Sequence, residues 1–193
     1  MMSSSPSVAL ERPITTTVTF ERLVRDHKDR IYGYVCRMTN DSPDAEDITQ
    51  EVFLRAYQSF HAFRHDAAVD TWLYRIATNL VIDRFRRARR APQVNQWDGS
   101  GESDEVREVP DPDRERDPQA RLARDELQRQ VQKAVFALPT NFRTVVLLHD
   151  MEGLSYEEVA QALGCPLGTV KSRLFNARLL LRRKLEHYMG NAE

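Results

Sequence analysis

The sequence SYEEVAQALGCPLGTVKSRLFNARLLLRRKL, residues 155–185, carries the strongest structural signal in the chain. Ser155 and Glu158 stand at the spacing of a capping box, which predicts a short helix that begins here and ends at Gly164. Pro166 lacks an amide hydrogen and is therefore suited to the first position of a second helix. The stretch predicts two helices joined by a tight turn.

The predicted second helix has two neighbouring stripes of different character. One stripe is apolar and repeats at helical spacing: Leu167, Val170, Leu174, Ala177 and Leu181. The other stripe is basic and aromatic: Lys171, Phe175, Arg178 and Arg182. Residues 159–185 contain six Lys or Arg and no acid. This pattern predicts a helix-turn-helix whose second helix faces a phosphate backbone, with a simple packing unit of two short helices as the structural alternative.

Composition limits the class of protein. Hydrophobic residues make up 41% of the 193 residues, and 28 bases nearly balance 29 acids, but the two signs are segregated along the chain. Cys36 and Cys165 lie far apart without metal-ligand spacing, so we expect no disulfide framework, metal or cofactor. Cys36 is expected to be a buried small residue, with redox sensing as the alternative. No signal peptide and no apolar run of about 18 residues is present, which favours a cytoplasmic protein without a membrane span.

The chain divides into an all-α arrangement of two small helical domains joined by an acidic flexible linker. Residues 1–18, rich in Ser, Thr and Pro, are expected to form a flexible N-terminus. The first domain, 19–90, is predicted to hold a helix from Phe20 to Met38, one from Pro43 to Phe60 capped by Ser42, a loop over 61–70 and a helix over 71–90. Residues 91–120 have nine acids, three bases and no apolar period, which predicts the linker. The second domain, 121–189, is expected to have about four helices, the last two being the helix-turn-helix.

Two charged segments in the first domain stand out. Asp44, Asp47 and Glu51 fall three and four residues apart on one helix face, which is consistent with a solvated face or with a docking surface for a basic partner. Five arginines occupy residues 84–90, after a loop and helix with several aromatic and polar groups. Aromatic rings beside arginines suit single-stranded nucleic acid. Trp72 taken alone is more often a core residue than one that stacks on a base.

Three segments in order give the chain a resemblance to a known family: DAEDITQEVFLRAY (44–57), FRHDAAVDTWLYRIATNLVIDRFRR (63–87) and LPTNFRTVVLLHDMEGLSYEEVAQALGCPLGTVKSRLFNAR (138–178). Together they resemble the extracytoplasmic-function sigma factors, the minimal two-domain members of the sigma-70 family. The resemblance covers about residues 20–185. It implies a subunit of bacterial RNA polymerase that contacts the beta-prime and beta subunits of the core enzyme and directs them to promoters.

The resemblance also implies roles for individual residues. The core polymerase would be bound by Asp44, Asp47, Gln50 and Glu51. The minus-ten promoter element, melted into single strands, would be bound by Phe63, Arg64, His65, Asp66, Trp72, Arg75, Asn79, Arg86 and Arg87. The minus-35 element, as duplex, would be bound by His149, Thr169, Lys171, Ser172, Arg173, Phe175, Asn176 and Arg178. Asn176 and His149 stand where some relatives carry arginine, so base preference or backbone contact at the minus-35 element is expected to differ.

The resemblance further implies an anti-sigma protein as partner and no enzymatic activity. Two alternatives belong to other classes. A helix-turn-helix regulator that binds duplex DNA without being a polymerase subunit would account for the second domain but not for the first. A metal-dependent phosphohydrolase would use the dipeptides His65-Asp66 and His149-Asp150, but these fall in separate predicted domains, whereas such a site needs several ligands to converge.

Overall fold

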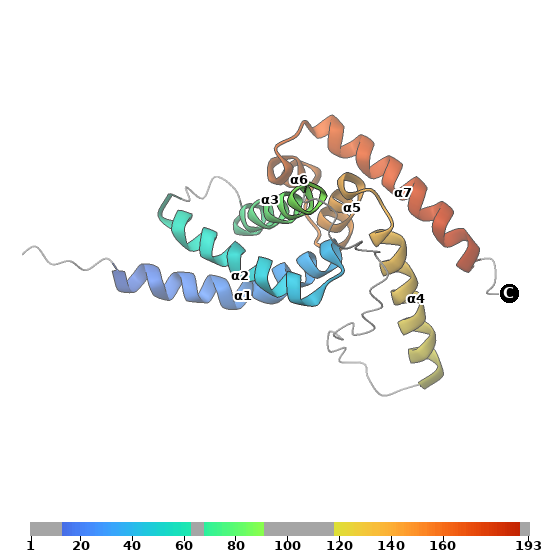
Figure 1. The fold of residues 1–193 in the computed structure, drawn as a ribbon, viewed down its shortest axis with the longest axis horizontal. Helices are drawn as coiled ribbons and strands as arrows, with labels where there is room; N and C mark the ends of the chain where they lie inside the picture. The colour runs from blue at the N-terminus through green and yellow to red at the C-terminus, as the bar shows by residue number, and fades with distance from the viewer. Residues whose placement is uncertain (1–12, 63–67, 91–117, 190–193) are drawn as a thin grey trace, which may run out of the picture.

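The computed structural model describes residues 13–62, 68–90 and 118–189, and every element in these ranges is helical (Figure 1). This confirms the all-α prediction. The elements are α1 (Pro13–Thr39), α2 (Ser42–Ser59), a 3-10 turn (Phe60–Ala62), α3 (Val69–Arg90), α4 (Pro118–Phe136), α5 (Thr140–Val146), a π-helical turn (Leu147–Met151), α6 (Tyr156–Leu163) and α7 (Leu167–Met189). None of these helices is both long and apolar enough to cross a membrane.

Three helices begin earlier than the sequence predicted. α1 starts at Pro13 and α4 at Pro118, so residues 13–18 and 118–120 are helical, where the sequence predicted a tail and a linker. Both starts are prolines, whose fixed φ angle and missing amide hydrogen suit the first helical position. α3 starts at Val69, so the last two residues of the predicted loop are helical. The remainder of the predicted tail and linker lies outside the described residues.

The turn between α1 and α2 is closed by Asp41 and not by Ser42. Asn40 has a φ of 55°, in the left-handed region that ends a helix. Asp41 is extended, and its carboxylate accepts a hydrogen bond of 2.8 Å from the amide of Asp44. Ser42 is the first helical residue. Both residue types cap helices well, and aspartate additionally places its negative charge at the positive end of the helix dipole.

The N-terminal half buries one face of each of its three helices. The apolar spacing predicted for α1 holds, because Ile31, Tyr34, Val35 and Met38 are buried. They pack in one buried cluster with residues of the two following helices: Val52 and Ala56 of α2 and Leu73, Ala77 and Val81 of α3. The hydroxyl groups of Tyr34 and Thr78 lie 2.7 Å apart, so this buried phenol has a hydrogen-bond partner.

The helix-turn-helix forms as predicted from its caps. The amide of Glu158 donates to the Ser155 hydroxyl at 3.2 Å, and the Ser155 amide donates to the Glu158 carboxylate at 2.8 Å, which completes the capping box. Gly164 ends α6 with a φ of 59°. Pro166 precedes α7 and is not its first residue, and its carbonyl accepts the amides of Thr169 and Val170. The prediction for Pro166 was therefore wrong by one position.

Gly164→Ala is expected to destabilise the protein by about 1–2 kcal/mol, because an L-residue is strained in the left-handed conformation. A Cβ at this position would meet no atom within 4 Å, so backbone strain is the whole cost. Gly168→Ala is the matched control: its Cβ also meets nothing, but Gly168 lies inside α7, where alanine is the better helix former. Urea unfolding of both variants checks this, and equal effects of the two substitutions would contradict it.

The two halves of the chain pack directly against each other. α6 of the helix-turn-helix lies against α3, and α1 contacts both α4 and α5 (Figure 1). The buried residues of both halves belong to one hydrophobic cluster. The sequence predicted two domains but gave no indication that they would be in contact.

Candidate nucleic-acid and polymerase interfaces

α7 presents its basic and aromatic stripe outward. Val170, Leu174 and Ala177 of the neighbouring stripe are buried, as their spacing predicted. On the outer face Phe175 is 70% exposed, an unusual position for a large aromatic ring in a folded protein. Lys171, Ser172, Asn176 and Arg178 are exposed beside it, whereas Thr169 and Arg173 are partly buried. The structure therefore places the predicted minus-35 residues of α7 together on one helix.

Two contacts from the preceding turn support this face. Arg178 donates through Nε and Nη2 to the two carboxylate oxygens of Asp150, at 3.2 and 2.5 Å, which fixes the guanidinium in one orientation. The ring of His149 stacks on Tyr156 at 4.5 Å between centroids, and its Nδ1 lies 2.6 Å from the carbonyl oxygen of Leu154. His149 thus holds the turn that leads into α6.

These contacts also bear on the phosphohydrolase alternative. Asp150 is paired with Arg178 and His149 with Leu154, so both members of this dipeptide have structural partners. Within the described ranges, no three His, Cys, Asp or Glu side chains gather as possible metal ligands. His65 and Asp66 lie outside the described residues, as do Phe63 and Arg64.

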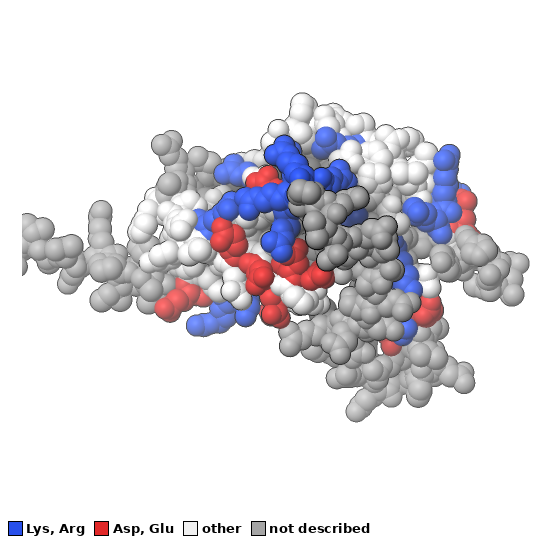
Figure 2. Space-filling view, in the orientation of Figure 1, with Lys and Arg blue, Asp and Glu red and all other residues white. Residues whose placement is uncertain are grey.

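The predicted minus-ten residues of α3 separate into exposed and buried groups. Arg75, Asn79, Arg86 and Arg87 are exposed. Figure 2 shows basic side chains gathered in the middle of one face, over α3, with acidic side chains beside them. Trp72, in contrast, is 7% exposed and belongs to the hydrophobic core, so its ring is not available for stacking on a base in this arrangement. The structure therefore favours a place in the hydrophobic core for Trp72 over a base-stacking role.

The acidic face of α2 is partly occupied by contacts within the chain. Asp44 forms an ion pair with Arg84 of α3, and its side chain is 13% exposed. Glu51 pairs with Arg55 one turn later, with 2.7 Å between Oε1 and Nε. Asp47 and Gln50 are exposed, and the exposed apolar residues Leu54 and Tyr57 continue the same helix face. Leu54 and Tyr57 were not among the residues predicted to bind polymerase, although both are apolar and stand at helical spacing from Gln50.

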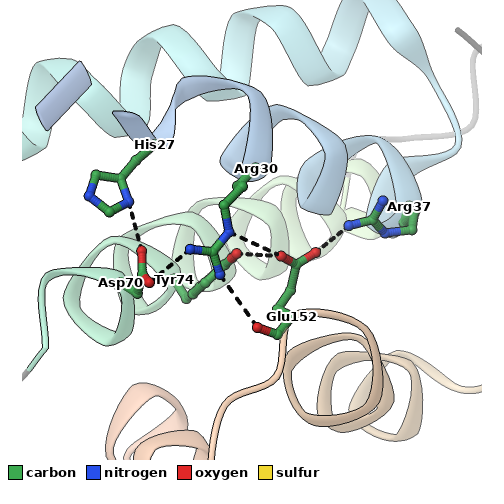
Figure 3. Close-up of polar contacts among 6 residues, drawn as sticks. All are labelled: His27, Arg30, Arg37, Asp70, Tyr74 and Glu152. Atoms are coloured by element: carbon green, nitrogen blue, oxygen red, sulfur yellow. Dashed lines mark hydrogen bonds and ion pairs between the residues drawn. The ribbon is translucent and has the colours of Figure 1, made fainter. Parts of the chain in front are cut away.

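A polar cluster around one buried carboxylate joins the two halves (Figure 3). Glu152, in the turn before α6, has a side chain only 5% exposed. Its carboxylate forms an ion pair with Arg37 of α1 and accepts a 2.5 Å hydrogen bond from the hydroxyl of Tyr74 of α3. Burial raises the pKa of the Tyr74 phenol far above its usual range, and the bond to Glu152 acts in the same direction, so this hydroxyl remains a donor.

Arg30 of α1 connects this cluster to the start of α3. Its guanidinium donates to Asp70 at 2.9 Å and to the backbone oxygen of Glu152 at 3.4 Å. Nδ1 of His27 lies 2.7 Å from the other Asp70 oxygen. We call the six residues of Figure 3 (His27, Arg30, Arg37, Asp70, Tyr74 and Glu152) the interface cluster. No sequence signal identified it, because residues that bond to each other in it are up to 122 positions apart along the chain.

Comparison with known proteins identifies the family. Residues 23–91 match the model of sigma-70 region 2, and residues 128–181 match that of sigma-70 region 4. The RNA polymerase sigma-H factor of Pseudomonas aeruginosa is 36% identical over 90% of this chain and 89% of its own length. The ECF RNA polymerase sigma factor SigW of Bacillus subtilis is 36% identical over 86% of this chain and 88% of its own.

Two solved structures share this fold. One is the sigma factor RpoE of Bartonella quintana, crystallised with the anti-sigma factor NepR; it covers 87% of this chain and 97% of its own, with 23% identity and a TM-score of 0.65. The other is CnrH in complex with the cytosolic domain of CnrY; it covers 89% and 90% of the two chains, with 26% identity and a TM-score of 0.62. With both sigma-70 regions present in order and curated relatives matched over most of the chain, the protein belongs to the extracytoplasmic-function (ECF) group of RNA polymerase sigma factors.

Proposed function

We propose that this sigma factor recognises promoters with both of its halves and binds the polymerase with the outer face of α2. The observation that carries this proposal is the exposed stripe of α7, where Phe175 stands 70% exposed among cationic and hydrogen-bonding side chains. A major groove accepts a helix of this kind. Lys171 supplies charge for phosphates, and Phe175 and Asn176 lie where they can contact base edges. Arg178 contributes less charge, because Asp150 already pairs with it.

The minus-ten element is assigned to α3. Arg75 and Asn79 lie one helical turn apart and are exposed, and the arginines at the end of the helix supply charge for phosphates of a single strand. Binding melted DNA better than duplex shifts the promoter toward opening, by an amount limited by the difference between the two affinities. The protein therefore promotes initiation as a binding subunit, and we assign it no catalytic residue.

The face of α2 formed by Asp47, Gln50, Leu54 and Tyr57 is assigned to the core polymerase, through the beta-prime subunit. It combines exposed apolar groups with a carboxylate, which is the composition expected of a surface that docks on a basic partner. Asp44 contributes less, because Arg84 already pairs with it. As the similar sigma factor RpoE was crystallised with the anti-sigma factor NepR, we also assign this protein an anti-sigma partner. Because we propose that the protein acts as a polymerase subunit, we assign it to the cytoplasm.

Asp47→Lys is expected to weaken binding to core polymerase about tenfold or more, because it puts a positive charge against a basic partner. The affinity of labelled protein for purified core enzyme measures this. Glu46→Lys is the matched control, with the same charge reversal on the next residue of α2. Glu46 is exposed on the side of the helix nearest Tyr32 and Cys36 of α1. Equal losses in the two variants would mean that net charge, and not this face, determines binding.

A further inference from the structure

The outer stripe of α7 carries less free charge than its sequence suggests. The cations of this stripe are Lys171, Arg178 and Arg182. Arg178 forms an ion pair with Asp150, and Arg182 forms one with Glu186. Lys171 forms no ion pair with any residue that the structure describes. Because each free cation that meets a phosphate strengthens binding to DNA of any sequence, the two ion pairs lower the sequence-independent attraction of this face.

The acid that pairs with Arg178 comes from a distant part of the sequence. Residues 159–185 contain no acid, but the π-helical turn brings Asp150 to Arg178 from 28 positions away. The side chains of Asp150 and Arg178 are 30% and 50% exposed, so the pair lies on the surface of the protein. An exposed ion pair contributes little to stability. Stability therefore does not account for a carboxylate on a face assigned to DNA, whose phosphates repel it.

Asp150 fixes the direction in which Arg178 points. Its two carboxylate oxygens accept hydrogen bonds from Nε and Nη2, and this side-on contact orients the plane of the guanidinium. The carboxylate does not bind Nη1, which is left to donate to DNA. Arg178 lies one turn after Phe175 on the same helix face, so a contact from Nη1 is made at a fixed position relative to that ring. An unpaired arginine, in contrast, reaches phosphates over a range of positions.

We propose that Asp150 is a positioning residue that makes minus-35 recognition selective, because it confines Arg178 to the docking position in which Phe175 meets a base. The proposal rests on the minus-35 face assigned above. In that position the oriented guanidinium makes its contact with little further loss of side-chain freedom. In other positions on DNA it is partly neutralised and is held back from the phosphates. Asp150 therefore weakens binding to unrelated sequences more than binding to the minus-35 element.

The test compares wild-type protein with Asp150→Asn, which removes the negative charge with almost no change in shape. Glu157→Gln is the control, since Glu157 is exposed in the first turn of α6 and loses the same charge without releasing Arg178. Asp150→Asn is also made in an Arg178→Gln background, where there is no guanidinium to release. Circular dichroism and a thermal melt establish that each variant is folded.

The measurement is a binding titration of each full-length protein with short labelled duplexes. One duplex carries the minus-35 element of a promoter mapped by sequencing of 5′ ends, and the other carries the same bases in scrambled order. The titrations are repeated between about 50 and 200 mM salt, because the slope of log affinity against log salt reports the number of phosphate contacts. The ratio of the two affinities reports selectivity.

We expect Asp150→Asn to bind the scrambled duplex about threefold or more tightly than wild-type protein does, with a salt slope steeper by about 0.9, the value for one additional phosphate contact. Affinity for the minus-35 duplex is expected to change by less than about twofold, so the ratio of the two affinities falls. Glu157→Gln is expected to show neither change. In the Arg178→Gln background, Asp150→Asn is expected to leave the salt slope as it is.

An unchanged salt slope in folded Asp150→Asn protein would overturn the proposal. Equal gains on the two duplexes would also overturn it, because the carboxylate would then lower affinity without affecting selectivity. A gain that persisted in the Arg178→Gln background would show that the carboxylate acts through its own charge and not through Arg178. If wild-type protein did not distinguish the duplexes, the assigned minus-35 face would fail and the selective role with it, while the salt slopes would still decide whether Asp150 restrains Arg178.

Discussion

Phe175→Ala is expected to lower transcription from promoters that depend on a minus-35 element about tenfold or more, without lowering the midpoint of thermal unfolding. The ring is 70% exposed in α7, so its removal takes little from the core. A good contact with a base in the major groove provides about 1–3 kcal/mol of discrimination, which corresponds to roughly five- to 150-fold. Multiround transcription with core polymerase and a fixed amount of each variant measures the effect.

Leu179→Ala is the matched control for this substitution. Leu179 is also an exposed apolar residue, at 41%, and lies one turn further along α7. Its loss removes a similar exposed side chain from the same helix, at a position to which no base contact is assigned. Equal losses of transcription for the two variants, or an unfolded Phe175→Ala protein, would contradict the assignment of Phe175 to the minus-35 element.

Arg143→Met is expected to destabilise the folded protein by about 3–5 kcal/mol, because it leaves buried carbonyl groups without a donor. Nη1 donates to the backbone oxygen of Met38 at 2.6 Å, at the end of α1. Nη2 donates to the backbone oxygens of Phe136 and Leu138, at the end of α4. Burial lowers the pKa of the guanidinium to about 10, so it is charged at neutral pH and needs these partners.

Urea unfolding at neutral pH measures the loss. Arg129→Met is the control, because Arg129 is exposed on α4 and its contact is an ion pair of 3.8 Å with Glu126. A surface pair of this kind is expected to contribute less than about 1 kcal/mol. If Arg143→Met lost no more stability than Arg129→Met, the carbonyl contacts of Arg143 would not hold α1, α4 and α5 together.

The helices and the outer face of α7 followed from the sequence because their causes are local. The capping box at Ser155, the left-handed Gly164 and the apolar period of α7 each depend on residues within a few positions of one another. The errors at helix starts have the same origin. Asp41 and Ser42 are adjacent residues that both cap well, and Pro13 begins a helix in a segment whose composition suggested disorder.

The contacts between the halves did not follow from the sequence. Glu152 and Arg37 are 115 positions apart, and Arg143 and Met38 are 105 apart. A single glutamate or arginine has no periodicity and gives no local signal of burial. Trp72 shows the same limit, since a tryptophan beside a basic segment suits both a core and a base-stacking site, and packing against other helices places it in the core.

The most direct test of the account is run-off transcription from fragmented genomic DNA by core polymerase, with and without this protein, followed by sequencing of the 5′ ends. We expect a new set of start sites that share two upstream elements, near minus-35 and minus-ten, and that appear only when the protein is added. If folded protein that binds core polymerase produced no new start sites, the account of promoter recognition divided between α7 and α3 would be contradicted.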